Sequence, residues 1–98
     1  MNTNYTRVKQ FNQVFGHPAP DSQQLNIFNE SINTVKLRNS LIKEEILELK
    51  EAIETENVIE IIDALSDIQY VAYGLLVVYG VDGDIEYGNY MENIWEGI

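Results

Sequence analysis

Two long stretches of helical periodicity, residues 35–53 and 58–79, are separated only by the short break at 55–57. Apolar residues recur at intervals of three and four in both stretches, which is the pattern of amphipathic helices. Thr55 or Asn57 is suited to cap the second helix at its N-terminus. Because the break is so short, the two helices must fold back on each other as an antiparallel hairpin. This hairpin constrains the fold more than any other feature of the chain.

Shorter segments flank the hairpin. Residues 4–15 also show helical spacing, and Gly16, followed by two prolines, is expected to end that helix. Residues 17–31 form a polar connector, and a last short helix is expected at 85–95. No segment alternates as a strand does. We therefore expect an all-α protein, four-helix-bundle-like in architecture, and a length of 98 residues suits one domain spanning 1–98.

Apolar stripes predict which faces of the two long helices form the core. On the first helix the stripe consists of Ile42, Ile46, Leu49 and Ile53. On the second it consists of Val58, Ile61, Ile62, Leu65, Ile68, Gln69, Ala72 and Leu76. Other apolar residues lie outside these stripes, so the second helix is apolar nearly all round, as is typical of a helix buried on several sides. We expect a second subunit to supply the missing surface, which makes the chain a homodimer or homotetramer.

The charge balance excludes several classes of function. The net charge is −10, and binding to a nucleic-acid backbone requires basic groups, so direct nucleic-acid binding is not expected. All six basic residues lie at or before Lys50. The chain has no cysteine, which excludes disulfides and thiolate metal sites. The first residues lack the apolar stretch of a signal peptide, and the most apolar run, 71–81, is too short to span a membrane. We expect a cytoplasmic protein that does not bind membranes.

Carboxylates gather on the two central helices. If the hairpin turns near Glu56, Glu45 lies level with Asp67 and Glu48 lies beside Asp63, with Glu60 about one turn nearer the tip. Converging like charges are unfavourable in a partly dry groove unless a cation neutralises them. Mg²⁺ prefers carboxylate oxygens and shares its coordination shell with phosphates. From the residues alone, three interpretations stay open: a solvated acidic face, a metal site and an acidic docking surface.

The carboxylate spacing resembles a known signature. Glu44-Glu45-x-x-Glu48 followed by Glu60-x-x-Asp63 is similar to the motif of the all-α nucleoside triphosphate pyrophosphohydrolases. That superfamily includes the MazG proteins, the phosphoribosyl-ATP pyrophosphohydrolases and the dimeric dUTPases. The flanking stretches VKQFNQVFGHP, LIKEEILELKEAI and DALSDIQYVAYGLLVVYGVD resemble its phage-type branch, so that the similarity covers roughly residues 5–82.

The resemblance implies both a fold and an activity. The fold is a MazG-type bundle over residues 1–98, completed by oligomerisation. The activity is hydrolysis of a nucleotide between its α- and β-phosphates, giving a monophosphate and pyrophosphate. It implies Mg²⁺ as cofactor, with Mn²⁺ as a substitute, and a cytoplasmic location, which is the host cytoplasm if the chain is viral.

The resemblance also implies roles for individual residues. The metal ligands that the resemblance implies are Glu45, Glu48, Glu60 and Asp63. The hairpin geometry instead favours Asp63 with Asp67. Glu60 and Asp67 are therefore alternatives for the last ligand. The candidate catalytic carboxylates are Glu44, Glu45 and Asp67, with Glu44 or Asp67 orienting the attacking water. The available phosphate partners are Arg38 and Lys43, or Arg7 and Lys9 of a neighbouring subunit.

A second function is compatible with the sequence. The basic-free half after residue 50 suits a catalytically silent acidic module that binds a basic protein surface or sequesters a nucleotide. His17, in a Gly-His-Pro turn, is expected to be a loop residue without partners. Most of the aromatic residues in the second half are expected to pack in the core or between subunits, and one of them is a candidate for lining a base pocket. They are Tyr70, Tyr73, Tyr79, Tyr87, Tyr90 and Trp95.

Overall fold

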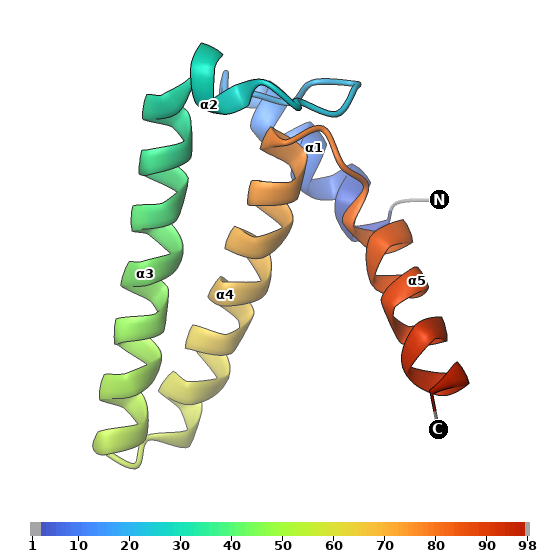
Figure 1. Cartoon of the computed structure of the whole chain (residues 1–98). Coiled ribbons are helices and arrows are strands. Elements are labelled where there is room, and N and C mark those ends of the chain that lie inside the picture. The colour runs from blue at the N-terminus through green and yellow to red at the C-terminus, as the bar shows by residue number, and fades with distance from the viewer. Residues whose placement is uncertain (1–2, 98) are drawn as a thin grey trace.

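The computed structural model describes residues 3–97, and the helices are labelled in Figure 1. The five helices are α1 (Asn4–Val14), α2 (Ile27–Glu30), α3 (Ile32–Glu54), α4 (Val58–Val78) and α5 (Gly83–Glu96). No strand occurs within residues 3–97, which confirms the all-α prediction. The predicted hairpin is α3 and α4, with α1 packed on α4 and with α5 reaching away from the hairpin (Figure 1). The short helix α2 lies within the segment expected to be a polar connector.

Three of the helices end in the same hydrogen-bonded motif. Beyond α1, α3 and α4, the second residue has a left-handed backbone, with φ of 72° at Gly16, 54° at Glu56 and 75° at Gly80. In each case the N–H groups of this residue and of the next one donate to carbonyls in the last helical turn. This is the Schellman arrangement, in which glycine is the usual left-handed residue. Glu56 is therefore the exception, and it forms the tip of the hairpin.

The two hairpin helices do not meet through the apolar stripes predicted from the sequence. On α4, the residues buried against its neighbours are Ala64, Val71, Gly74, Val77 and Val78. No residue of the predicted stripe is fully buried: Val58 is 66% and Ile62 60% exposed, whereas Ile61, Ile68, Ala72 and Leu76 are half-buried. The predicted core face was thus wrong for α4. Small residues allow helix axes to approach closely, and the resulting rotation of α4 turns Asp67 toward α3.

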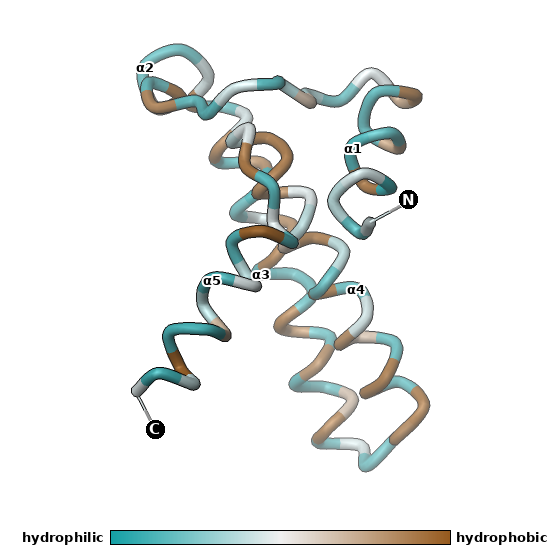
Figure 2. The backbone as a smooth tube through the Cα atoms, turned by 90° about the vertical axis from the view of Figure 1, so that its right-hand side faces the viewer, coloured by the Kyte–Doolittle hydropathy of each residue, from teal (hydrophilic) through white to brown (hydrophobic). Residues whose placement is uncertain are grey.

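The chain is open for its size. Its radius of gyration is 15.2 Å, compared with about 13 Å for a compact domain of this length. Its accessible surface is 7318 Å², compared with about 5700 Å² for a compact monomer of the same mass. Hydrophobic residues recur along the hairpin toward its tip (Figure 2). Among them Ile46, Ile53 and Ile59 are more than half exposed, so the helices leave apolar surface without a partner.

Within residues 3–97, α4 is the one helix whose length and composition would allow it to cross a membrane, with a mean hydropathy of 1.5 over its most apolar window. The core helices of soluble proteins pass the same test. The helix also carries Glu60, Asp63 and Asp67, and such groups are costly in lipid. The apolar window of α4 is 22% buried within residues 3–97, so most of its apolar surface has no partner in this part of the chain.

Candidate functional site

Three carboxylates from two helices converge at mid-length of the hairpin. Glu45 and Glu48 on α3 and Asp67 on α4 each place one oxygen within 4.8 Å of the other two. Glu45 and Glu48 are three residues apart and share a helix face. Asp67 reaches the same level because Glu45 and Asp67 are each eleven residues from Glu56 at the tip. The register of the hairpin therefore builds the group.

Three other predicted carboxylates lie outside this group. Glu44 is exposed, although it adjoins Glu45 in sequence. Asp63 is exposed one turn before Asp67. Glu60 is exposed in the first turn of α4, where its backbone N–H donates to the Asn57 side chain at 3.2 Å. Of the alternatives left open by the sequence, the structure places Asp67 beside Glu45 and leaves Glu60 nearer the tip.

The electrostatics of the group are dominated by Glu45. Burial is the largest cause that raises the pKa of Glu45, and the adjacent carboxylates of Glu48, Asp67 and Glu44 act in the same direction; together they bring it to about 7. Its Oε2 atom is buried and has no hydrogen-bond partner. A buried polar atom without a partner is unfavourable, and so is a cluster of like charges. Both features are relieved by a positive charge in the middle of the group.

The donor set fits a hard divalent cation. It consists of carboxylate oxygens from two helices, without nitrogen or sulfur, which is the ligand type that Mg²⁺ and Mn²⁺ prefer. The unpartnered Oε2 of Glu45 supplies an oxygen that no protein donor occupies. Exposed acidic groups commonly occur without a bound ion. A half-buried carboxylate with a raised pKa is less common and more often belongs to a functional site.

A cavity of about 510 Å³ adjoins the carboxylates. Glu45 and Asp67 line one part of it, and Leu37, Arg38 and Gly74 line another. This volume is in the range of small-molecule binding sites. Arg38 forms no ion pair within residues 3–97, and its Nε is buried without a partner. Lys43, the other predicted phosphate partner, is exposed and does not line the cavity.

His17 also lines this cavity, which the sequence did not predict. Its position depends on Asn12, which is only 1% exposed. The backbone N–H of His17 donates to the Asn12 carbonyl at 2.8 Å, and the Asn12 side chain donates to the Pro18 carbonyl at 3.2 Å. A polar residue within the first helix, just before a Gly-His-Pro turn, is the one signal that could have indicated this anchored loop.

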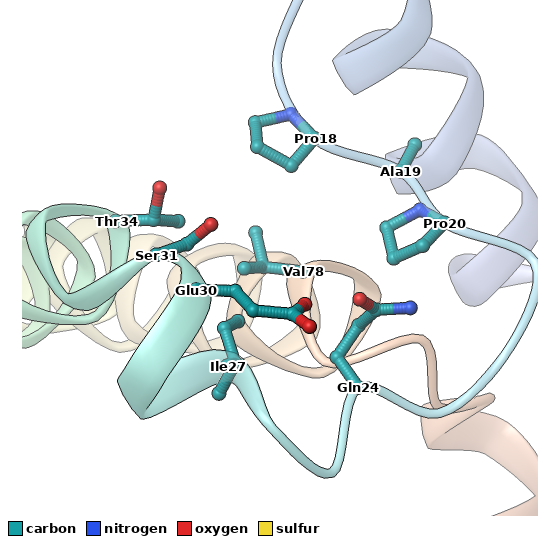
Figure 3. A pocket seen from close by; sticks show the side chains of 9 residues that line it. All are labelled: Pro18, Ala19, Pro20, Gln24, Ile27, Glu30, Ser31, Thr34 and Val78. Atoms are coloured by element: carbon teal, nitrogen blue, oxygen red, sulfur yellow. The ribbon is translucent and has the colours of Figure 1, made fainter.

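A second cavity, of about 400 Å³, lies under the connector. Figure 3 shows Pro18, Ala19 and Pro20 across it from Ile27 and Val78. Glu30 is its one charged lining residue, so it lacks converging carboxylates. The chemistry that could bind a cation therefore belongs to the cavity beside Glu45.

A helical hairpin that brings carboxylates together beside a cavity is the arrangement of the all-α nucleotide pyrophosphohydrolases. Residues 8–87 match the family described as phosphoribosyl-ATP pyrophosphohydrolase. The chain belongs to this family, whose members hydrolyse a phosphoanhydride bond and typically depend on a divalent metal.

Most of the chain is also similar to a viral protein. Over 82 residues the chain is 51% identical to "Uncharacterized protein L479" of Acanthamoeba polyphaga mimivirus. The similarity covers 84% of this chain but 33% of the relative, so the chain spans about a third of the length of that protein. A viral relative fits the resemblance to the phage-type branch.

Proposed function

We propose that the chain is a Mg²⁺-dependent nucleotide pyrophosphohydrolase. It cleaves the bond between the α- and β-phosphates of a nucleoside triphosphate or a related nucleotide, and it releases a monophosphate and pyrophosphate. The observation that carries this proposal is the convergence of Glu45, Glu48 and Asp67 beside a cavity of small-molecule size. Membership of the family supports the type of reaction.

The residues divide into distinct roles. Glu45, Glu48 and Asp67 hold the cation, and Mn²⁺ substitutes for Mg²⁺ because both accept carboxylate oxygens. When bound, Mg²⁺ neutralises the phosphate charge and lowers the pKa of the attacking water. Glu44, exposed beside the group, orients that water as a general base. Positioning and charge neutralisation then supply most of the catalysis.

Two further carboxylates have a secondary role in the proposal, because they lie outside the group of Glu45, Glu48 and Asp67. Asp63 and Glu60 lie on α4 between Asp67 and the tip, and both are exposed. They are available to a second cation, or to water molecules around the first one. Their substitution should therefore have smaller effects than substitution of Asp67.

We propose that the active form is a homodimer or a homotetramer. The chain exposes about 1600 Å² more surface than a compact monomer of its mass, whereas each partner in a standard interface buries about 800 Å². The exposed part of the apolar stripe on α4, with Val58 and Ile62, would lie in this interface. We propose that the assembly works in the cytoplasm, which is the host cytoplasm if the chain is viral, and that it does not bind nucleic acid or membranes directly. The viral relative supports a host location.

The proposal is tested by measuring pyrophosphate release from a panel of nucleotides with and without Mg²⁺. Wild type should turn over at least one of them only with the cation. Asp67→Asn should abolish release, and Glu60→Gln should retain most of it. If no nucleotide is cleaved and Glu48→Ala binds nucleotides as wild type does, the enzyme proposal fails. Salt-sensitive binding to a basic protein that ignores Mg²⁺ would then support the silent acidic module.

A further inference from the structure

The cavity beside the carboxylates has two chemically different ends. Glu45 lines one end, and Leu37, two turns earlier on α3, lines the other. These residues are eight positions apart, which corresponds to about 12 Å along the helix axis. Asp67 and Gly74 are related in the same way on α4. The cavity therefore runs along the hairpin, away from the carboxylates and toward the connector that carries His17.

Among residues 3–97, Arg38 is the only basic side chain with a permanent charge that lines the cavity. A Cβ on Gly74 would lie 3.7 Å from its Nη1 atom, so the guanidinium lies close to the backbone of α4 where that helix has no side chain. Its Nε is buried without an acceptor, and the part of the chain described here offers it no carboxylate within ion-pair distance. Its donors are thus available to a ligand, and a ligand acceptor would remove the cost of leaving the Nε–H group buried and unpaired.

We propose that this distant end of the cavity binds the nucleobase, and that Arg38 donates hydrogen bonds to the acceptor edge of the base. The inference rests on the proposed function, because it takes the α-phosphate to lie at Glu45 and Asp67. The β- and γ-phosphates beyond the α-phosphate are too short to reach from the carboxylates to the far end of the cavity. A nucleoside that leads away from the α-phosphate is long enough to reach Arg38.

The walls between the two ends suit a flat ring. Leu41 and Val71 are apolar, and Tyr70 adds an aromatic surface. The Tyr70 ring is held by an edge contact to Phe11, with ring centroids 5.7 Å apart. Sites for small ligands are commonly built in this way, with apolar walls and a few polar groups that fix orientation. The apolar walls fit a base better than they fit a charged phosphate chain.

The chemistry of Arg38 predicts which base is preferred. A guanidinium has only donors, arranged as a rigid fork. Guanine presents two neighbouring acceptors, O6 and N7, to such a fork, whereas adenine presents a donor beside N7. The site should therefore discriminate in favour of guanine nucleotides, and a bidentate contact of this kind corresponds to about tenfold or more in affinity.

The test measures binding of GMP and AMP in the presence of Mg²⁺ by calorimetry, together with kcat/KM for GTP and ATP. Wild type should bind GMP at least about tenfold more tightly than AMP. Arg38→Gln should bring the two affinities together and raise KM for GTP more than it lowers kcat. Arg38→Lys should lose most of the discrimination, because a single ammonium cannot contact two acceptors as the fork does. The matched control is Lys36→Gln, which removes an exposed positive charge two residues away on the same helix.

The outcomes separate the two proposals. Equal binding of GMP and AMP to wild type would overturn the base-binding inference, whatever the catalytic activity. An Arg38→Gln variant that keeps the wild-type ratio of the two affinities would also overturn it. If that variant binds both nucleotides more weakly by the same factor, Arg38 contacts a phosphate. Discrimination in binding without any turnover would leave the base site standing and would remove only the hydrolase proposal. Circular dichroism and Mn²⁺ binding establish that the Arg38 variants are folded.

Discussion

Glu45 on α3 and Asp67 on α4 place carboxylate oxygens within 4.8 Å of each other across the hairpin, and Glu48 joins them. The two residues are separated by 22 positions in sequence but stand at the same distance from the tip. Their proximity raises the free energy of the unliganded protein, because like charges repel and because Glu45 is partly buried. A bound cation would turn this repulsion into attraction.

Removal of a carboxylate from this group should weaken cation binding. We expect Asp67→Asn and Glu45→Gln each to lower Mn²⁺ affinity by at least about tenfold, since even the loss of an outer partner of a metal ligand has that effect. Titration calorimetry measures the affinity directly. Glu60→Gln is the matched control, because it also removes one charge from α4 but lies outside the group. Equal weakening by Glu60→Gln and Asp67→Asn would contradict the assignment of Asp67.

The level of each carboxylate on the hairpin could be predicted from the sequence. Helix rise is constant, so counting from the break at 55–57 places Glu45 opposite Asp67 without knowledge of any contact. The motif comparison alone favoured Glu60, which the structure leaves outside the group. The alignment of α3 with α4 could be predicted because the connection between the two helices is short.

The rotation of α4 could not be predicted in the same way. The helix carries apolar residues on most of its surface, and the sequence pattern predicts that its widest stripe, which includes Ile62, forms the core. In the structure the narrower face of Ala64, Val71 and Gly74 is buried instead. Which face meets which partner depends on close approach between helices and on surfaces outside the chain. The anchoring of His17 through Asn12 likewise depends on how a loop folds back, which no local pattern specifies.

The hairpin tip offers a stabilising substitution. Glu56 has a left-handed backbone, with φ of 54°, at a position where α1 and α4 have glycine. The left-handed conformation is unfavourable for a residue with a Cβ by roughly 1–2 kcal/mol, and part of the gain is offset by the greater freedom of glycine in the unfolded chain. Glu56→Gly should therefore raise the free energy of unfolding by about 0.5–1 kcal/mol. Urea denaturation at fixed protein concentration measures it.

The control for the tip is Glu54→Gly. Glu54 is the last residue of α3. Glycine there should lower the free energy of unfolding by between zero and about 1 kcal/mol. A lower stability for Glu56→Gly than for wild type would show that the left-handed conformation is not the limiting feature of this turn.

Two buried or half-buried glycines should respond to alanine in opposite ways. A Cβ on Gly80 would lie 1.9 Å from the Ser22 carbonyl oxygen, and the residue has φ of 75°. Gly80→Ala should therefore destabilise the protein by about 3 kcal/mol, combining steric overlap with left-handed strain. On Gly74, within α4, a Cβ meets only Arg38 at 3.7 Å, which is an ordinary contact. Gly74→Ala should raise stability by about 0.5–1 kcal/mol through helix propensity.

Thermal unfolding of both variants at one protein concentration tests this contrast. A lower melting temperature for Gly80→Ala than for wild type, together with a higher one for Gly74→Ala, is the expected result. A loss of stability in Gly74→Ala would mean that α3 and α4 approach more closely at Arg38 than the structure indicates.

Asp84 ties the start of α5 to the rest of the protein, and its removal should weaken that connection. Its carboxylate accepts hydrogen bonds from the Tyr5 backbone N–H at 2.9 Å and from the Tyr73 hydroxyl at 2.7 Å. The bond from Tyr5, followed by that from Tyr73, lowers the pKa of Asp84 below its ordinary value, although burial opposes the shift. Asp84→Asn should lower the free energy of unfolding at pH 7 by about 1.5–3 kcal/mol, the usual range for hydrogen bonds to charged groups.

The lowered pKa also fixes the sign of the pH dependence. The stabilisation by Asp84 is fully present above the unfolded pKa of about 3.9 and is lost as the pH falls through the lower folded value. The difference in unfolding free energy between wild type and Asp84→Asn should therefore shrink as the pH falls below about 4. Denaturation curves between pH 7 and pH 3 measure this difference. Asp21→Asn is the control, because Asp21 pairs with Lys9 while its side chain is 94% exposed, so its removal should change stability much less. A constant difference across this pH range would exclude Asp84 as an ionised acceptor.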